Sequence, residues 1–149
     1  TGVQTCALPI YENYFRYLHD KYPDKVGITI GFVPDLARKI YAGADLFLMP
    51  SKSEPCGLSQ MVALRYGTLP IVRETGGLKD SITDCGDGQG NGFTFKTYDA
   101  YDMLGAIYRG VDAYNSKDWN VLVKRALECD MSWGKSANEY IKMYRSLLK

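Results

Sequence analysis

One segment of this chain combines residue types that could bind an anion beside a carboxylate. It runs from Pro50 to Gln60 and reads PSKSEPCGLSQ. A short apolar run precedes it, and apolar residues at helical spacing follow from Leu58, so it is predicted to connect a strand to a helix. The first backbone N–H groups of a helix have no partner within the helix and carry the positive end of its dipole. The segment is therefore a candidate anion site.

A single acidic residue, Glu54, lies inside this candidate anion site. Its carboxylate would repel an anion unless it faces a neutral group such as a sugar hydroxyl. Gly57 has no Cβ, so a phosphate could approach the backbone closely, and Leu58 and Ser59 could offer N–H groups. Together these features predict a nucleotide-sugar site. The residues alone leave a second explanation equally open, in which Glu54 only complements the helix dipole.

Strands and helices must alternate to position this segment. Strands are predicted at residues 26–30, 46–49, 69–72 and 93–95, with helices between them, and the run at 46–49 is continuously apolar, as expected of a central strand. Helices are predicted before Pro23, from after Gly57 to Gly67, after Asp99, after Asp118 and behind a capping Ser132. In the helix after Asp99, the apolar residues Met103, Leu104, Ile107 and Val111 are predicted to form one face. The pattern predicts an α/β fold, a Rossmann-like parallel sheet with helices on both faces and a helical C-terminal end. In such sheets ligands bind at the carboxyl ends of the strands.

Three other patterns have structural interpretations. The glycine-rich segment 86–92 lacks the residues of a phosphate-binding motif, so we interpret it as a flexible surface loop. Thr75, Gly76 and Gly77 could approach a ligand, but a turn is the favoured interpretation. An apolar stripe on the last helix is interpreted as packing in the core or against another domain. That stripe comprises Trp133, Ala137, Tyr140, Ile141, Tyr144 and Leu148.

The composition excludes several classes of function. The chain has 149 residues and a formal net charge of +1, which gives no indication of a nucleic-acid partner. Its apolar runs are far shorter than the ~20 residues of a membrane-spanning helix, so no membrane partner is predicted. The cysteines after the first ten residues form no CxxC pair. They predict reduced thiols, no metal site and a cytoplasmic location.

The first ten residues, TGVQTCALPI, resemble the translation of a sequencing-adapter oligonucleotide. An ordinary N-terminal tail is the alternative. We exclude residues 1–10 from fold prediction and expect residues 11–149 to form one domain.

Three blocks of the sequence resemble the bacterial glycogen synthases. These blocks are Ala44–Ser51, Glu54–Gln60 and Arg65–Leu78. Many other transferases of GT-B architecture carry a second glutamate eight residues after the first, where this chain has Val62. The presence of Cys56 and Gln60 is instead similar to the glycogen and starch synthases that use ADP-glucose.

The resemblance implies that residues 11–149 are an incomplete C-terminal, nucleotide-sugar-binding domain of a GT-B fold. The implied enzyme is a hexosyltransferase that moves glucose from ADP-glucose to the non-reducing 4-hydroxyl end of an α-1,4-glucan, with retention of configuration. No metal or other cofactor is implied. The family carries a basic pair and a whole N-terminal domain upstream, and these are absent here. We therefore expect the chain alone to be inactive.

The resemblance also implies roles for residues of the candidate site. Glu54 matches the glutamate that contacts hydroxyls of the transferred glucose, and it is the implied catalytic residue. Gly57 and Leu58 match the backbone cradle of the distal phosphate, and Cys56 and Ser59 lie in the same set of donor contacts. A small buried side chain is the alternative for Cys56.

Phe32 matches a position where the family carries an aromatic ring against the adenine, with core packing as the alternative. Two other functions remain open for the whole chain. One is a non-catalytic nucleotide-binding module, and the other is a different GT-B transferase or phosphorylase.

Overall fold

The computed structural model describes residues 8–148 and divides into two compact units, one ending at Asp35 and the other comprising Leu36–Lys149. Each unit is described by itself. Residues 1–7 of the adapter-like start lie outside the described residues, so the interpretation of residues 1–10 stays a prediction.

The first unit contains helix α1 (Leu8–Lys21) and an extended segment after it. The predicted helix before Pro23 is thus confirmed, but the predicted strand at 26–30 is wrong. Val26 and Ile28 are half-buried in the alternating manner of a strand. A strand also needs a neighbouring backbone to satisfy its N–H and C=O groups, and none of the described strands pairs with these residues.

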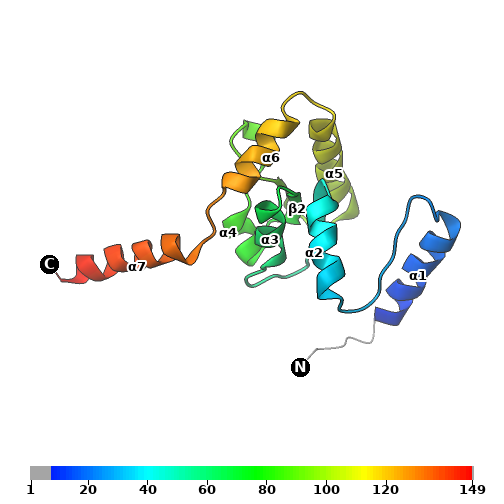
Figure 1. Ribbon diagram of the computed structural model, residues 1–149, viewed down its shortest axis with the longest axis horizontal. Helices are drawn as coiled ribbons and strands as arrows, with labels where there is room; N and C mark the ends of the chain where they lie inside the picture. The colour runs from blue at the N-terminus through cyan, green and yellow to red at the C-terminus, as the bar shows by residue number, and fades with distance from the viewer. Residues whose placement is uncertain (1–7, 149) are drawn as a thin grey trace. The chain divides into compact units, whose positions relative to one another are not determined.

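The second unit is built on three parallel strands, β1 (Leu46–Met49), β2 (Leu69–Arg73) and β3 (Phe93–Phe95), in the order β1-β2-β3 (Figure 1). The bounds match the predicted strands closely. The expectation that residues 46–49 form the central strand is wrong, because β2 lies between the other two. Accordingly, β2 is buried along almost its whole length, whereas Leu48 of β1 is 41% exposed.

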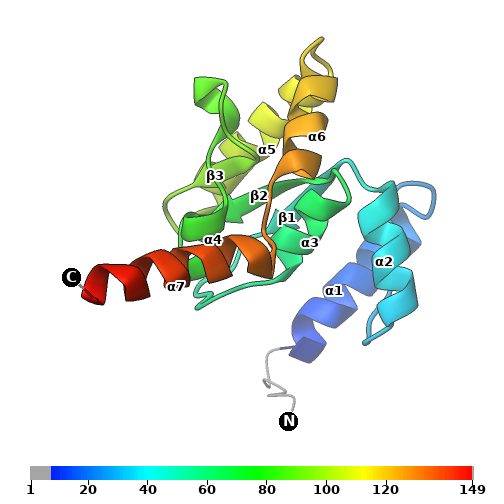
Figure 2. The same cartoon turned by 60° about the vertical axis from the view of Figure 1, so that its left-hand side comes forward.

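Helices cover both faces of this sheet, as predicted (Figures 1 and 2). One face packs against α5 (Ala100–Tyr114) and the first part of α6 (Trp119–Glu128). The other packs against α3 (Ser59–Arg65), α4 (Gly76–Ser81) and the end of α6. Ile71 belongs to the first core and Val72 to the second, because successive strand residues point to opposite faces.

The predicted helix ends at Gly67 and Asp99 are confirmed, whereas Asp118 occupies the N-cap position of α6 without a side-chain capping hydrogen bond. Helix α2 (Pro34–Gly43) begins at a proline, whose fixed φ suits a first helical position. Helix α3 ends at Arg65, and Gly67, with φ 79°, follows its C-cap residue Tyr66. The N–H of Thr68 donates to the C=O of Ala63 at 3.0 Å in a Schellman motif. Asp99 caps α5, accepting from the N–H of Tyr101 at 2.9 Å.

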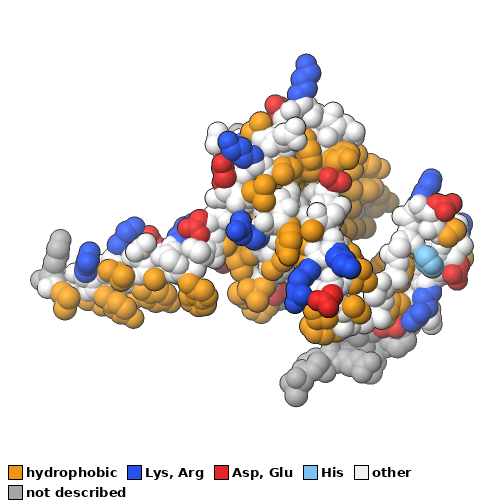
Figure 3. All heavy atoms as spheres, in the orientation of Figure 1, with side chains coloured by type: hydrophobic (Ala, Val, Ile, Leu, Met, Phe, Trp, Pro, Cys, Tyr) orange, Lys and Arg blue, Asp and Glu red, His pale blue; other side chains and the backbone are white. Residues whose placement is uncertain are grey.

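The last helix, α7 (Trp133–Leu147), differs from the prediction in two ways. Ser132 occupies the N-cap position, but its side chain makes no capping hydrogen bond. The apolar stripe lies along one side of the helix (Figure 3), yet it contacts no core, and Trp133 is 87% exposed. The described residues therefore provide no packing partner for this stripe, so packing in the core is wrong and packing against another domain stays a prediction.

A similar correction applies to α5, where Leu104 and Val111 are exposed although they were expected on the buried face. Small residues, Ala106 and Gly110, occupy the centre of that face instead. The methyl groups of Ile71 and Leu46 would lie only 3.3 Å from a Cβ at Gly110, so the glycine allows α5 to approach the sheet closely.

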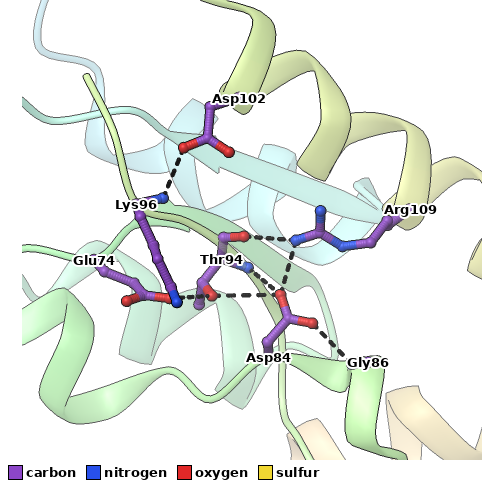
Figure 4. A network of polar contacts seen from close by, with 7 residues as sticks. All are labelled: Glu74, Asp84, Gly86, Thr94, Lys96, Asp102 and Arg109. Carbon is purple, nitrogen blue, oxygen red and sulfur yellow. Dashed lines mark hydrogen bonds and ion pairs between the residues drawn. The ribbon is translucent and has the colours of Figure 1, made fainter. Parts of the chain in front are cut away.

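The glycine-rich segment 86–92 is more ordered than the predicted flexible loop. It includes a 3-10 turn, η1 (Cys85–Asp87), and a Cβ at Gly90 would lie 2.1 Å from the backbone oxygen of Asp84. The Asp84 carboxylate anchors the segment by accepting hydrogen bonds from the N–H groups of Gly86 and Thr94 and from Arg109 (Figure 4). Burial raises the pKa of Asp84, but these hydrogen bonds outweigh it and lower the pKa below its usual value.

None of the described helices is long and apolar enough to cross a membrane.

Candidate functional site

The candidate site lies at the carboxyl edge of the sheet. All three strands are parallel, so the loops that follow them meet at one edge. Residues 50–58 form the loop after β1 and lead into α3. The predicted position of the Glu54 loop is therefore confirmed.

The backbone carbonyls of residues 54–57 in this loop are held on one side. The N–H of Gly77 lies 3.2 Å from the oxygen of Glu54 and 3.3 Å from that of Pro55. The Nε2 of Gln60 lies 2.9 Å from the oxygen of Gly57 and 3.4 Å from that of Cys56. Four successive carbonyls therefore face α4 or the Gln60 side chain.

This arrangement turns three N–H groups toward the opposite side. In a trans peptide the N–H points away from the C=O of the preceding residue, and the described chain has no cis peptide bond. The N–H groups of Cys56, Gly57 and Leu58 consequently face away from α4 and Gln60. They donate to no acceptor among the described residues. The loop thus presents a row of free donors suited to a phosphate or a sugar hydroxyl.

Gly57 and Glu54 lie against each other beside these donors. Gly57 has φ 71°, and a Cβ there would lie 2.7 Å from Oε1 of Gln60 and 3.1 Å from Cγ of Glu54. Only glycine fits such a position without strain. The Glu54 side chain is half-buried and has no hydrogen bond or ion pair with any described residue. A carboxylate in this state can accept hydrogen bonds from a ligand.

The remaining loop residues are accessible. Cys56 is exposed, with its Sγ 3.8 Å from the oxygen of Gly57, so its interpretation as a buried side chain is wrong. Leu58 is 67% exposed and Ser59 is half-buried at the start of α3. Because α3 has only seven residues, its dipole is weak, and the free N–H groups rather than the helix supply the binding capacity.

Phe32 belongs to the first unit, where its ring is 93% exposed. The core-packing alternative is therefore wrong, and stacking on a base stays a prediction. The structure thus brings five of the predicted residues together where the loop meets α3, while Phe32 is separate from them in the chain. These five are Glu54, Cys56, Gly57, Leu58 and Ser59.

The sequence analysis missed the residues that hold the loop from the neighbouring strand. Arg73, at the end of β2, donates from Nε to the oxygen of Ser51 at 2.9 Å and from its guanidinium to the oxygen of Lys52. A Cβ at Gly76 would lie 2.0 Å from the oxygen of Glu54, and one at Gly77 would lie 1.9 Å from the oxygen of Cys56. The two glycines therefore open α4 and let it contact the loop, so their interpretation as a turn is wrong.

A signal for this contact was present in the sequence. Parallel strands at 46–49 and 69–72 must end at the same edge, and a glycine pair soon after the second strand permits a close backbone approach. Among the described residues, no group of three His, Cys, Asp or Glu side chains is placed to hold a metal ion.

Comparison with known proteins gives consistent matches. The model of the family described as glycosyl transferases group 1 matches residues 20–116. The glycogen synthase of Bacillus cereus (strain ATCC 10987) is 51% identical over 142 residues, which are 93% of this chain and 30% of that protein. The glycogen synthase of Fervidobacterium nodosum is 54% identical over 138 residues, which are 91% of this chain and 28% of that protein.

Solved structures also match the chain in fold and in sequence. One of them is the catalytic domain of Starch Synthase IV from Arabidopsis thaliana bound to ADP and acarbose, with a TM-score of 0.80 and 37% identity. The match covers 95% of this chain and 31% of the other. The chain spans about 30% of the length of the curated relatives it matches. The family match, which extends over more than half of the residues, shows that the chain belongs to the group 1 glycosyl transferases.

Proposed function

We propose that this chain forms the donor-binding part of a glycogen or starch synthase that transfers glucose from ADP-glucose to the 4-hydroxyl end of an α-1,4-glucan, with retention. The observation that carries the proposal is the row of free N–H groups at Cys56, Gly57 and Leu58 beside the unpartnered carboxylate of Glu54. Similarity to glycogen synthases, and to a starch synthase solved with ADP and acarbose, supports this choice of donor and acceptor.

Each group has a specific role in the proposal. The N–H groups of Gly57 and Leu58 hold the distal phosphate of the donor, with Cys56 and Ser59 in the same contact set. Glu54 accepts hydrogen bonds from hydroxyls of the glucose, which removes the conflict between a carboxylate and a nearby anion. The exposed ring of Phe32 stacks on the adenine.

In the proposed reaction, the group that most needs stabilisation is the leaving diphosphate. As the bond between the glucose C1 and the phosphate oxygen breaks, negative charge builds on the diphosphate and positive charge on the sugar ring. Fixed N–H donors aimed at the diphosphate stabilise that charge without reorganisation. The Glu54 carboxylate helps to hold the glucose in place for attack by the acceptor hydroxyl. The proposal requires neither a metal nor another cofactor.

In this proposal, the preceding part of the enzyme lies on the other side of the bound donor. That part supplies the acceptor-binding groups and further positive charge, so the chain alone binds ADP weakly and transfers no glucose. The proposed reaction involves no nucleic acid and no membrane.

Calorimetric titration and a transfer assay test the proposal together. The chain is titrated with ADP and ADP-glucose, and it is also joined to the preceding part of the Bacillus cereus glycogen synthase for assay with ADP-glucose or UDP-glucose and a glucan. We expect weak binding by the chain and transfer by the joined protein, preferentially from ADP-glucose. Tight ADP binding by the chain without transfer by the joined protein would instead identify a nucleotide-binding module. Transfer from UDP-glucose alone would indicate a different transferase.

A further inference from the structure

Gln60 is a fully buried polar residue that the proposed chemistry does not use. Its exposed fraction is 0%, and its Nε2 lies 2.9 Å from the oxygen of Gly57 and 3.1 Å from Oγ of Ser81. Its Oε1 is buried and has no hydrogen-bond partner among the described residues. The two shorter hydrogen bonds of this side chain therefore link the loop after β1 to α4.

The orientation of this amide follows from its neighbours. If the amide were turned over, Oε1 would face the carbonyl oxygens of Gly57 and Cys56. No hydrogen bond could then form, because all three oxygens are acceptors and none carries a proton. The NH2 group must therefore face the loop. Among neutral side chains of this length, an amide can donate two hydrogen bonds from one nitrogen atom.

Ser81 connects Gln60 to Gly77, another residue whose hydrogen bonds hold the loop. Its Oγ accepts from Gln60 and donates to the oxygen of Gly77 at 2.6 Å. The N–H of Gly77 in turn approaches the carbonyl oxygens of Glu54 and Pro55. The contacts form a closed chain from the loop, through α3 and α4, back to the loop.

The unpartnered Oε1 indicates that this amide is not optimal for stability. A buried acceptor without a partner costs free energy, and an apolar side chain of similar shape would avoid that cost. An apolar residue could not donate to the carbonyl oxygens of Gly57 and Cys56, so the direction of these carbonyls would no longer be fixed. Because each carbonyl sets the direction of the next N–H, the N–H groups of Leu58 and Gly57 would no longer be fixed either.

We infer that Gln60 and Ser81 form a positioning pair that aims the N–H groups of Gly57 and Leu58 at the donor phosphate without touching the substrate. This inference rests on the proposed function, because that function assigns the phosphate to those two groups. The order of the loop in the absence of any ligand is the property that the pair controls directly.

Amide hydrogen exchange of the ligand-free chain tests the inference, with ADP titration as a second readout. The variants are Gln60→Met, Ser81→Ala and Ser81→Thr, which keeps the hydroxyl. The matched control is Thr68→Val, because Thr68 is 1% exposed and its Oγ1 lies 2.6 Å from the oxygen of Tyr41 and 2.9 Å from that of Ala44, before β2 begins. Like Gln60→Met, this control removes buried hydrogen bonds to backbone oxygens.

The free N–H groups of residues 56–58 have no acceptor among the described residues to lose, so loop exchange is measured at the N–H of Gly77, which donates to the loop carbonyls of Glu54 and Pro55. We expect Gln60→Met to raise this loop exchange by roughly tenfold or more, the loss of about one hydrogen bond's worth of protection. Ser81→Ala should raise it less, and Ser81→Thr should leave it unchanged. Thr68→Val should lower the unfolding midpoint without changing exchange in the loop. ADP affinity should fall in Gln60→Met and stay unchanged in the control.

Unchanged loop exchange in both Gln60→Met and Ser81→Ala would overturn the inference, as would an equal rise in the Thr68→Val control. The exchange measurement needs no ligand, so it separates this inference from the proposed function. If the loop loosens but the protein joined to the preceding part of the Bacillus cereus enzyme transfers no glucose, the control of loop order by this pair stands and the proposed function fails.

Discussion

Substitution of Gly77 by alanine should separate α4 from the candidate site. The added Cβ would lie 1.9 Å from the oxygen of Cys56, 2.6 Å from its carbonyl carbon and 2.7 Å from its Cα. These are backbone atoms, which cannot rotate away as a side chain can. Because C···O contacts normally measure about 3.3–3.6 Å, α4 and the loop must separate by roughly 1.5 Å.

The cost of that separation has two parts. Forcing a methyl group into a closely packed place costs about 1–3 kcal/mol. The hydrogen bonds from the Gly77 N–H to the carbonyls of Glu54 and Pro55 lengthen as well, and losing such a bond costs about 1 kcal/mol. The free energy of unfolding should therefore fall by about 2–4 kcal/mol.

Urea unfolding followed by circular dichroism measures this effect. With a denaturant slope of about 1–3 kcal/mol per molar urea, the midpoint of Gly77→Ala should fall by roughly 1 M or more. The matched control is Gly105→Ala in α5, where nothing lies within 4 Å of the added Cβ. Better helix propensity should make this control more stable by about 0.5–1 kcal/mol. If Gly77→Ala unfolded at the same urea concentration as the original chain, the described contact between α4 and the loop would be refuted.

Two further predictions concern Asp84 and Phe32. The pKa of Asp84 is lowered in the folded chain, so its ionised form contributes stability that is complete above its unfolded pKa of about 3.9 and is lost as the pH falls through the lower, folded value. Urea midpoints should therefore fall more steeply below pH 4 in the original chain than in Asp84→Asn, and parallel curves would contradict this. Because the Phe32 ring is 93% exposed, Phe32→Ala should change the free energy of unfolding by less than about 0.5 kcal/mol. It should nevertheless weaken ADP binding in calorimetry, and unchanged affinity would contradict the stacking role.

Local signals in the sequence were sufficient for most of the elements. The strands at 46–49, 69–72 and 93–95 are present because apolar side chains at these positions have cores to enter. A helix stops just before Gly67 as expected, because glycine adopts the positive φ at this position with less strain than any other residue. The loop of the candidate site could likewise be located at the carboxyl edge of the sheet.

Errors arose where the outcome depends on a distant partner. Residues 26–30 alternate like a strand but have no described neighbour to pair with. The stripe on α7 is absent from the core, so of its two interpretations only packing against another domain stays a prediction. The contact of Gly77 with Cys56 joins α4, which follows β2, to the loop after β1. Sequence periodicity reports which face of an element is apolar and not what packs against it, so only the glycine pair after the second strand signalled this contact.

The central claim is that Glu54 contacts the glucose of the donor while the neighbouring N–H groups hold the phosphate. Steady-state kinetics and ADP titration of Glu54→Ala in the joined protein test it most directly, with Glu139→Ala on α7 as a control in which an exposed glutamate is removed elsewhere. We expect kcat to fall by roughly 100-fold or more in Glu54→Ala, while the Kd for ADP changes by less than about threefold. Equal losses in kcat and in ADP affinity would contradict the assignment of Glu54 to the sugar.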